Sequence, residues 1–152
     1  MQTLLTRPGT YRALTTLTAL LYLYLFATLL FTPQSFLDGL GIAGTAATAF
    51  LSRRCATLML GFATLLLAGR KAPPSAARQA ILLAVGICMA GLALTGVVGY
   101  GRGTVKADFL LAAAVESVLA ASFLLLWFAN RRRSAALPTP PAARSPSNGG
   151  RA

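Results

Sequence analysis

Four long apolar runs alternate with short polar stretches along the chain, at residues 13–31, 51–69, 80–100 and 109–128. An α-helix rises about 1.5 Å per residue, so each run spans roughly 30 Å, the thickness of a bilayer's hydrocarbon core. The pattern predicts an all-α polytopic membrane protein. We expect residues 1–133 to form one domain, a bundle of four transmembrane helices.

The two ends of the chain need separate interpretations. Arg7 and Arg12 precede the first run, as in a signal peptide. That run, however, is longer than a usual signal core and lacks a small-residue cleavage site followed by polar mature sequence, so we interpret it as a retained helix. Residues 134–152 are rich in Pro, Ser and Gly, with almost nothing apolar to bury, and predict a disordered basic tail.

The composition supports a membrane protein, because 56% of residues are hydrophobic and only 11% are charged. The net charge of +11 would suggest nucleic-acid binding in a soluble domain. Here no polar segment is long enough to fold a nucleic-acid reader, and basic residues beside spans contact lipid phosphates. The expected partner is therefore the lipid bilayer and not nucleic acid. The excess of Arg over Lys, with abundant Ala and Leu, is typical of bacteria with GC-rich genomes.

The basic residues also predict an orientation. With four spans, the N-terminal segment, the second connection and the C-terminal tail lie on one side and hold ten Lys and Arg, against four on the other side. Because basic residues concentrate on the cytoplasmic side, both termini are expected in the cytoplasm, with the protein in the inner (plasma) membrane. The three acids, Asp38, Asp108 and Glu116, then belong to the outward half.

Residues 98–101, VGYG, match the core of a potassium-channel filter. Such a filter requires a pore helix and a re-entrant loop, whereas this stretch ends a continuous apolar run. Val97 stands where the filter has a threonine, and Arg102 follows as a cation where an acid is usual. We interpret the stretch as a helix end.

Residues 39–44, GLGIAG, match the dinucleotide-binding pattern GxGxxG. That fingerprint needs a preceding strand and an acid about twenty residues later, and neither is predicted here. The glycines therefore predict an outward loop or a short interfacial helix. Cys55 and Cys88 lie in different apolar runs of a chain without histidine, which predicts small buried hydrophobic residues and no metal site. No cofactor is expected.

Small residues mark the third run as a packing helix. Gly86 and Ala90 are four residues apart, and Gly91 and Gly96 follow. Small side chains let neighbouring helix backbones approach closely in a membrane, where the lipid provides no hydrophobic drive for association. We expect these four positions to contact another helix, either within the chain or in a second copy.

Glu116 is the most unusual residue of the fourth run, because an ionisable group on a spanning helix is energetically unfavourable. At about 100° per residue its face carries mostly alanine and phenylalanine, while large aliphatic residues occupy the opposite face. This pattern predicts that Glu116 points into the bundle.

Depth along the four runs places other polar residues in the same outer layer: Tyr24, Arg53, Arg54, Thr57 and Thr95. An arginine that begins the second run could pair with Glu116 and keep it ionised. Without a pair, burial favours the neutral acid. Two alternatives remain open: a purely structural pair, and a site for a ligand, an ion or a proton.

The second span with its leading arginines (FLSRRCATLMLGFATLLLAGR), the start of the third (RQAILLAVGI) and the glycine-rich turn before the fourth (GRGTVKADFLLAAAVESVLAAS) resemble a family of uncharacterised bacterial integral membrane proteins with four helices. The resemblance covers most of residues 13–128. It implies the four-helix fold and no particular activity.

These features favour a non-enzymatic accessory or interaction protein, in a larger membrane complex or as a homo-oligomer. A small proton-linked transporter that uses Glu116 is the alternative. A membrane enzyme is the weakest hypothesis, because the chain has no histidine and its three acids form no obvious catalytic or metal-binding set.

Overall fold

The computed structural model describes residues 8–136 of the chain, and the side chains of residues 9–131. The regular secondary structure of this part of the chain is all helical, with five helices and no strand. They are α2 (Pro8–Phe31), α3 (Pro33–Leu40), α4 (Ala46–Gly69), α5 (Ala76–Gly101) and α6 (Phe109–Ala136). All except the short α3 are long and apolar enough to cross a membrane, with candidate spans of 23, 24, 26 and 23 residues. The predicted fold class is confirmed.

Capping residues start two of the long helices before the apolar runs begin. Thr45 accepts a hydrogen bond from the backbone N–H of Thr48, 3.1 Å away, and the Thr48 hydroxyl accepts one from the backbone N–H of Thr45. This reciprocal pair satisfies two otherwise unpaired donors and starts α4 at Ala46. Ser75 similarly accepts from the backbone N–H of Arg78 and starts α5 at Ala76. As a result Arg78, which the hydropathy pattern leaves in a connection, lies in the first turn of a helix.

The fourth long helix runs further than its apolar pattern predicts. α6 ends at Ala136, so residues 134–136, expected in a disordered tail, are helical. A helix can continue past its apolar stretch because its backbone hydrogen bonds are internal. The remainder of that expected tail, from residue 137 onward, lies outside the described residues.

Both glycine-containing motifs lie at helix ends. The VGYG stretch forms the last turn of α5, and Gly103 just beyond has a φ of 70°. The glycine-rich residues 39–44 end α3 and begin the following loop, where Gly41 has a φ of 79° and its N–H bonds back to α3. A left-handed glycine of this kind is a common helix terminator. A short helix and a loop therefore both occur in this region, and the preceding element is a helix.

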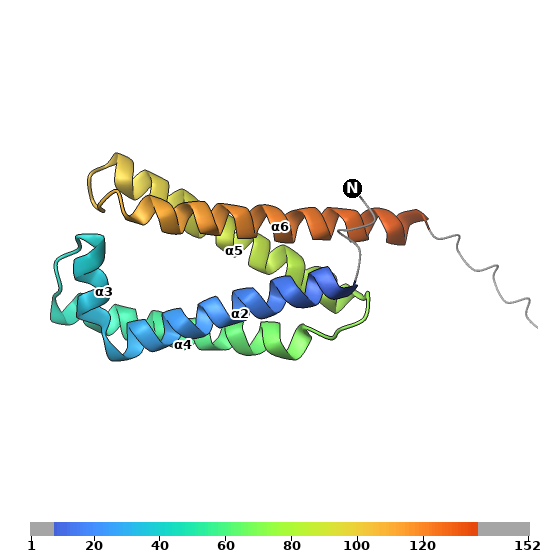
Figure 1. Ribbon diagram of the computed structural model, residues 1–152, viewed down its shortest axis with the longest axis horizontal. Helices are drawn as coiled ribbons and strands as arrows, with labels where there is room; N and C mark the ends of the chain where they lie inside the picture. Colours follow the sequence, from blue (N-terminus) through green and yellow to red (C-terminus); the bar gives the residue numbers. More distant parts are fainter. Residues whose placement is uncertain (1–7, 137–152) are drawn as a thin grey trace, which may run out of the picture.

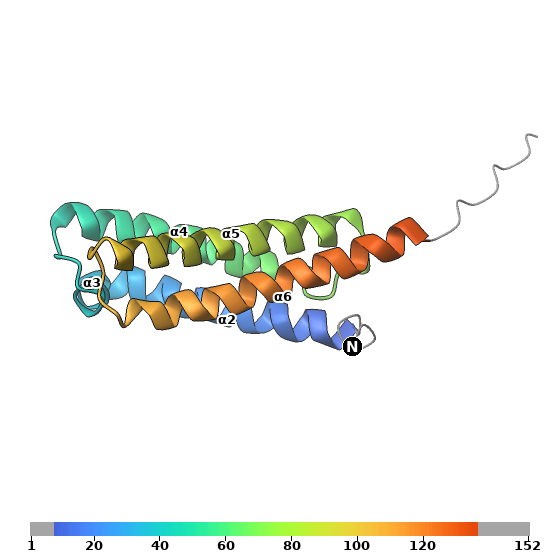
Figure 2. The same cartoon turned by 90° about the horizontal axis from the view of Figure 1, so that it is seen from above.

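The four long helices form two antiparallel pairs. α2 packs mainly on α4 and α5 mainly on α6, and the contacts between the pairs are much sparser. Figure 1 shows the two pairs close together where α2 begins, α4 leads into α5 and α6 ends, and apart at the end that carries α3. From above, all four helices run roughly along one axis (Figure 2). We call these pairs the α2–α4 and α5–α6 hairpins.

Each hairpin is held by a seam of residues spaced three and four apart, as in antiparallel coiled coils. On α2 the seam includes Tyr11, Thr15, Thr18 and Tyr22, all at most 1% exposed. The facing helix α4 contributes mostly small residues, Ala49, Ser52, Ala56 and Ala63. Because the hairpin is antiparallel, Ala63 lies beside the Tyr11–Tyr22 stretch, where Tyr22 stacks on Phe62, and Ala49 lies beside the end of α2.

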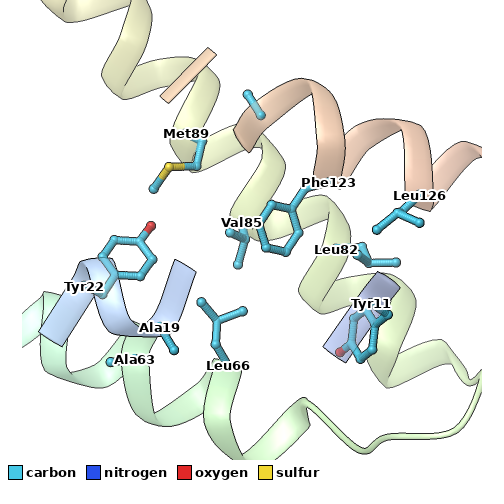
Figure 3. Close-up of a cluster of buried hydrophobic side chains, with 11 residues drawn as sticks. Tyr11, Ala19, Tyr22, Ala63, Leu66, Leu82, Val85, Met89, Phe123 and Leu126 are labelled. Carbon is cyan, nitrogen blue, oxygen red and sulfur yellow. The ribbon is translucent and has the colours of Figure 1, made fainter. Parts of the chain in front are cut away.

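One hydrophobic core joins the two hairpins, and it lies in the half of the molecule where they converge (Figure 3). All four long helices contribute to it: Tyr11, Ala19, Tyr22, Ala63, Leu66, Leu82, Val85, Met89, Ala120, Phe123 and Leu126. Tyr22, Met89 and Ala120 are the members nearest the end where the hairpins diverge. This cluster is called the shared core below.

At the opposite end, α3 and the α5–α6 connection link the hairpins again. The backbone N–H of Lys106 donates to the carbonyl of Leu40, 3.1 Å away. The Lys106 side chain covers Gly41 so closely that a Cβ built there would lie 2.7 Å from its Cγ. We call this contact the outer clasp.

Candidate functional site

Glu116 lies on the face of α6 that is turned toward the protein, as the sequence predicts. Residues of the same face are buried: Ala113, Ala120 and Phe123, at 3%, 6% and 0% exposed. Residues of the opposite face are exposed: Leu111, Val118 and Leu125, at 75%, 66% and 55%. Glu116 itself is half-buried, one helical turn beyond Ala120. The carboxyl group therefore lies where the shared core ends and the hairpins begin to separate.

Two polar groups at this boundary of the core come from different hairpins. Tyr22 of α2 is fully buried, and its hydroxyl lies 4.0 Å from Sγ of Cys88 on α5. Glu116 of α6 lies at the same boundary, one turn from the core member Ala120. Figure 3 shows the Tyr22 hydroxyl directed across the core toward Met89, the neighbour of Cys88 in sequence. We call Tyr22, Cys88 and Glu116 the inter-hairpin polar cluster.

One carboxylate oxygen of Glu116 has no partner. Its Oε2 is buried and accepts no hydrogen bond from any residue within 8–136. A buried carboxylate without a hydrogen bond or counter-charge is costly, more so in a medium of low polarity. The cluster can therefore supply a proton-binding carboxyl, a hydroxyl and a thiol at one place, with unused capacity for a hydrogen-bonding partner.

The expected pairing of Glu116 with the arginines of α4 does not form. Arg53 and Arg54 are both exposed, and the Arg54 guanidinium carbon lies 5.8 Å from the centroid of the Phe50 ring. Arg53 lines a hollow near the α2–α3 turn. The physical reason is the pairing of the helices: α4 packs on α2, whereas Glu116 belongs to the other hairpin.

The three hydroxyl residues expected beside Glu116 also lie elsewhere. Tyr24 is 64% exposed, and Thr57 and Thr95 are on exposed helix faces. The two threonine hydroxyls donate to carbonyls of their own helices, at Arg53 and Leu92, with distances of 3.3 and 2.8 Å. These three residues have a depth in the bundle similar to that of Glu116, but their side chains do not point toward it. The structure does not assemble the predicted outer polar layer.

The four small residues of α5 separate into two kinds. A Cβ built on Gly86 would lie 2.8 Å from Cδ2 of Leu124, and one on Gly96 would lie 2.9 Å from Cδ1 of Phe109, so both glycines are in close contact with α6. Ala90 and Gly91 are exposed, and a Cβ on Gly91 would meet nothing within 4 Å. The expected Gly86–Ala90 pair is not a packing pair here, because only Gly86 faces the neighbouring helix.

Two buried polar residues of the structure, Tyr22 and Arg78, are not among the site residues that the sequence predicts. The sequence predicts Tyr24 as the tyrosine of the polar layer. The signal for Tyr22 is a helical spacing on one face that it shares with Tyr11, Thr15 and Thr18. Two residues along a helix correspond to roughly 200°, so Tyr24 must point away from that face. The second residue is Arg78, which is only 7% exposed. Ser75, three residues before it, was the available signal for a helix start.

The cysteines and acids form no metal site within the described part of the chain. Among residues 8–136 no group of three or more Cys, Asp or Glu side chains is arranged to hold a metal ion. Cys88 is half-buried, whereas Cys55 is exposed, contrary to the expectation that both are buried. Cys55 is exposed because it lies, like its neighbour Arg54, on the face of α4 that points away from α2.

No family model, curated protein or solved structure matches this chain. The resemblance to four-helix bacterial membrane proteins therefore stays a prediction.

Proposed function

We propose that this chain is a four-span protein of the bacterial inner membrane, with both termini in the cytoplasm. The ten-to-four distribution of basic residues supports this orientation. The even number of long helices supports placing both termini on one side of the membrane, because the start of α2 and the end of α6 lie at the same end of the molecule (Figure 1). A reporter fused to the C-terminus tests the orientation: activity of a cytoplasm-specific reporter is expected, and activity of a periplasm-specific reporter would contradict it.

Within that membrane we propose a non-enzymatic interaction protein that binds a polar group of another membrane helix at the inter-hairpin polar cluster. The observation that carries this proposal is the buried Oε2 of Glu116, which has no hydrogen-bond partner within residues 8–136. In hydrocarbon an acid of this kind is stabilised by a donor from a neighbouring helix, which reaches the buried Oε2 when the weakly connected hairpins move apart. The partner is a larger membrane complex or a second copy of the chain.

The packing of the hairpins supports the same proposal. Their shared core ends at Tyr22, Met89 and Ala120, so the halves of the helices beyond it are held mainly within each hairpin. Large apolar side chains are exposed in this half, including Leu94 and Leu111 at 65% and 75%. Faces of this kind can contact either lipid or another apolar helix, and Glu116 adds a polar point of attachment between them.

Site-specific photo-crosslinking in native membranes tests the interaction. A photoreactive residue at Ala112, one turn from Glu116 on the same face, is compared with one at the opposite, exposed Leu111. We expect an intermolecular adduct from position 112 that is lost in Glu116→Gln, while adducts from position 111 do not change. An adduct of twice the chain mass identifies a second copy, and any other mass identifies a different protein. Adducts at position 112 that survive Glu116→Gln contradict the proposal.

A small proton-linked transporter is the second candidate, and one observation favours it. The inter-hairpin polar cluster joins a carboxyl, a hydroxyl and a thiol from two weakly connected hairpins, and relative movement of such hairpins could change access to the carboxyl. Proteoliposomes with a trapped pH indicator test it. Glu116→Gln should abolish gradient-driven proton flux without loss of folded protein, and flux equal to that of wild type would exclude this candidate.

A further inference from the structure

Arg78 carries a buried guanidinium group at the end of the molecule opposite α3. The residue is 7% exposed, and its guanidinium carbon lies 3.8 Å from the centroid of the Tyr11 ring. The Tyr11 hydroxyl in turn donates to the carbonyl of Gly69, at 3.1 Å. Three helices, α2, α4 and α5, therefore fix the position of one cation, with an aromatic ring against one face of its guanidinium plane.

One donor of this guanidinium, Nε, is not used within the described chain. Nε of Arg78 is buried and has no hydrogen-bond partner among residues 8–136. The ring of Tyr11 attracts the cation but cannot accept in-plane hydrogen bonds from its edge. A buried charge that lacks a hydrogen-bonding counter-ion is strongly destabilising, because it loses the water that solvated it.

No acid at this end of the described chain can neutralise Arg78. Of the three acids, Asp38 and Asp108 lie near the outer clasp, and Glu116 lies beyond the shared core in the same direction. The other charged side chains near the Arg78 end are cations: Arg12, Arg70, Lys71 and Arg131. Arg78 also occupies the first turn of α5, where the helix dipole adds partial positive charge. All these contributions favour an anion.

We propose that Arg78, supported by Tyr11 and the first turn of α5, binds a phosphate group. A guanidinium edge presents paired donors that match phosphate oxygens, and the partial positive charge of the helix start adds to the attraction. In the proposed orientation Arg78 lies close to the cytoplasmic end of a span, which is the depth of lipid headgroups. The phosphate belongs either to an anionic phospholipid or to a free phosphate ion. This site is separate from Glu116 and does not depend on the interaction proposed there.

Native mass spectrometry of the full chain in detergent tests the proposal. Phosphatidylglycerol and diacylglycerol, which has the same acyl chains but no phosphate, are titrated separately into wild type, Arg78→Gln and Arg12→Gln. Arg12 is the matched control, because it is a cation at the same end but is exposed. We expect preferential binding of phosphatidylglycerol, weakened on the order of tenfold by Arg78→Gln and much less by Arg12→Gln. Equal binding of the two lipids, or equal losses in the two variants, would overturn the proposal.

Two further measurements cover a failure to fold and the source of the phosphate. If Arg78→Gln does not fold, Arg78→Lys keeps the charge and loses the planar fork, so it should still weaken phosphatidylglycerol binding, while Arg12→Lys should not. An Arg78→Lys variant that binds like wild type overturns the site. Added inorganic phosphate that displaces the lipid identifies the phosphate group itself as the ligand. Lipid binding that resists inorganic phosphate but still requires Arg78 identifies the intact phospholipid.

Discussion

The hydroxyl of Tyr22 lies 4.0 Å from the sulfur of Cys88, so a tyrosine of α2 meets a cysteine of α5 across the two hairpins. Tyr22 also stacks on Phe62 of α4, with ring centroids 5.5 Å apart and planes inclined by 19°. One side chain therefore contacts a residue of its own hairpin and a residue of the other. Because the hairpins share few contacts, the side chains at this boundary contribute much to holding them together.

Tyr22→Ala is expected to lower the free energy of unfolding by about 3–5 kcal/mol, because it removes a fully buried aromatic ring. Tyr24→Ala is the matched control and should cost about 0.5 kcal/mol or less, since Tyr24 is 64% exposed. Unfolding by a denaturing detergent in mixed micelles, followed by Trp127 fluorescence, measures both. Equal losses in the two variants would contradict the assigned burial.

Gly86→Leu is expected to destabilise the α5–α6 hairpin by about 1–3 kcal/mol, because a side chain there meets Leu124 and Phe123 of α6. At Gly91 the same substitution should have little effect on packing, since a Cβ there has no neighbour within 4 Å. Thermal unfolding of the two variants in one detergent compares them directly. A larger loss at Gly91 would mean that this glycine is covered by another chain.

Gly41→Ala should loosen the outer clasp at a cost of about 1–2 kcal/mol. The residue has a φ of 79°, and its new Cβ would collide with the Lys106 side chain. Gly39→Ala is the control inside α3, where nothing lies within 4 Å and alanine favours the helix. Hydrogen exchange of residues 102–108 is the measurement: protection should fall in Gly41→Ala alone. Unchanged protection would show that the clasp does not hold this connection.

Thr45→Ala is expected to fray the first turn of α4 and to cost about 0.5–2 kcal/mol, because it removes the side-chain acceptor of the capping box. Thr64→Ala removes an exposed hydroxyl that bonds only to the carbonyl of Leu60 in the same helix, so it should be nearly neutral. Amide exchange at Thr48 and Ala49, whose N–H groups bond to Thr45, reports the difference. Equal protection in the two variants would indicate that packing and not the cap holds this turn.

Much of the fold follows from local properties of the sequence. The apolar runs predicted four membrane-length helices, and the face pattern of α6 correctly turned Glu116 toward the protein. The predicted starts of α4 and α5 were less accurate, because capping by Thr45 and Ser75 extends each helix before its apolar run. Thr and Ser are preferred capping residues and can be recognised in the sequence, but a hydropathy pattern does not detect them.

The candidate site was less predictable because it depends on which helices are neighbours. Depth along a span placed Arg54 and Tyr24 near Glu116, yet one lies on the other hairpin and the other points outward. The burial of Arg78 is not predicted from the sequence for a related reason: it depends on Tyr11, which is 67 positions earlier in the chain.

The sequence by itself therefore determined the number of long helices, their apolar character and the inward direction of Glu116, because helical period and hydropathy act within one segment. Only the tertiary structure decided that α2 pairs with α4 and α5 with α6. That pairing places Cys88 and Glu116 in one hairpin and Tyr22 in the other, so the Tyr22–Cys88 contact crosses between the hairpins, and Arg53 and Arg54 remain exposed. The physical reason is that all four spans offer similar apolar surface, so hydropathy within one segment does not distinguish one possible neighbour from another.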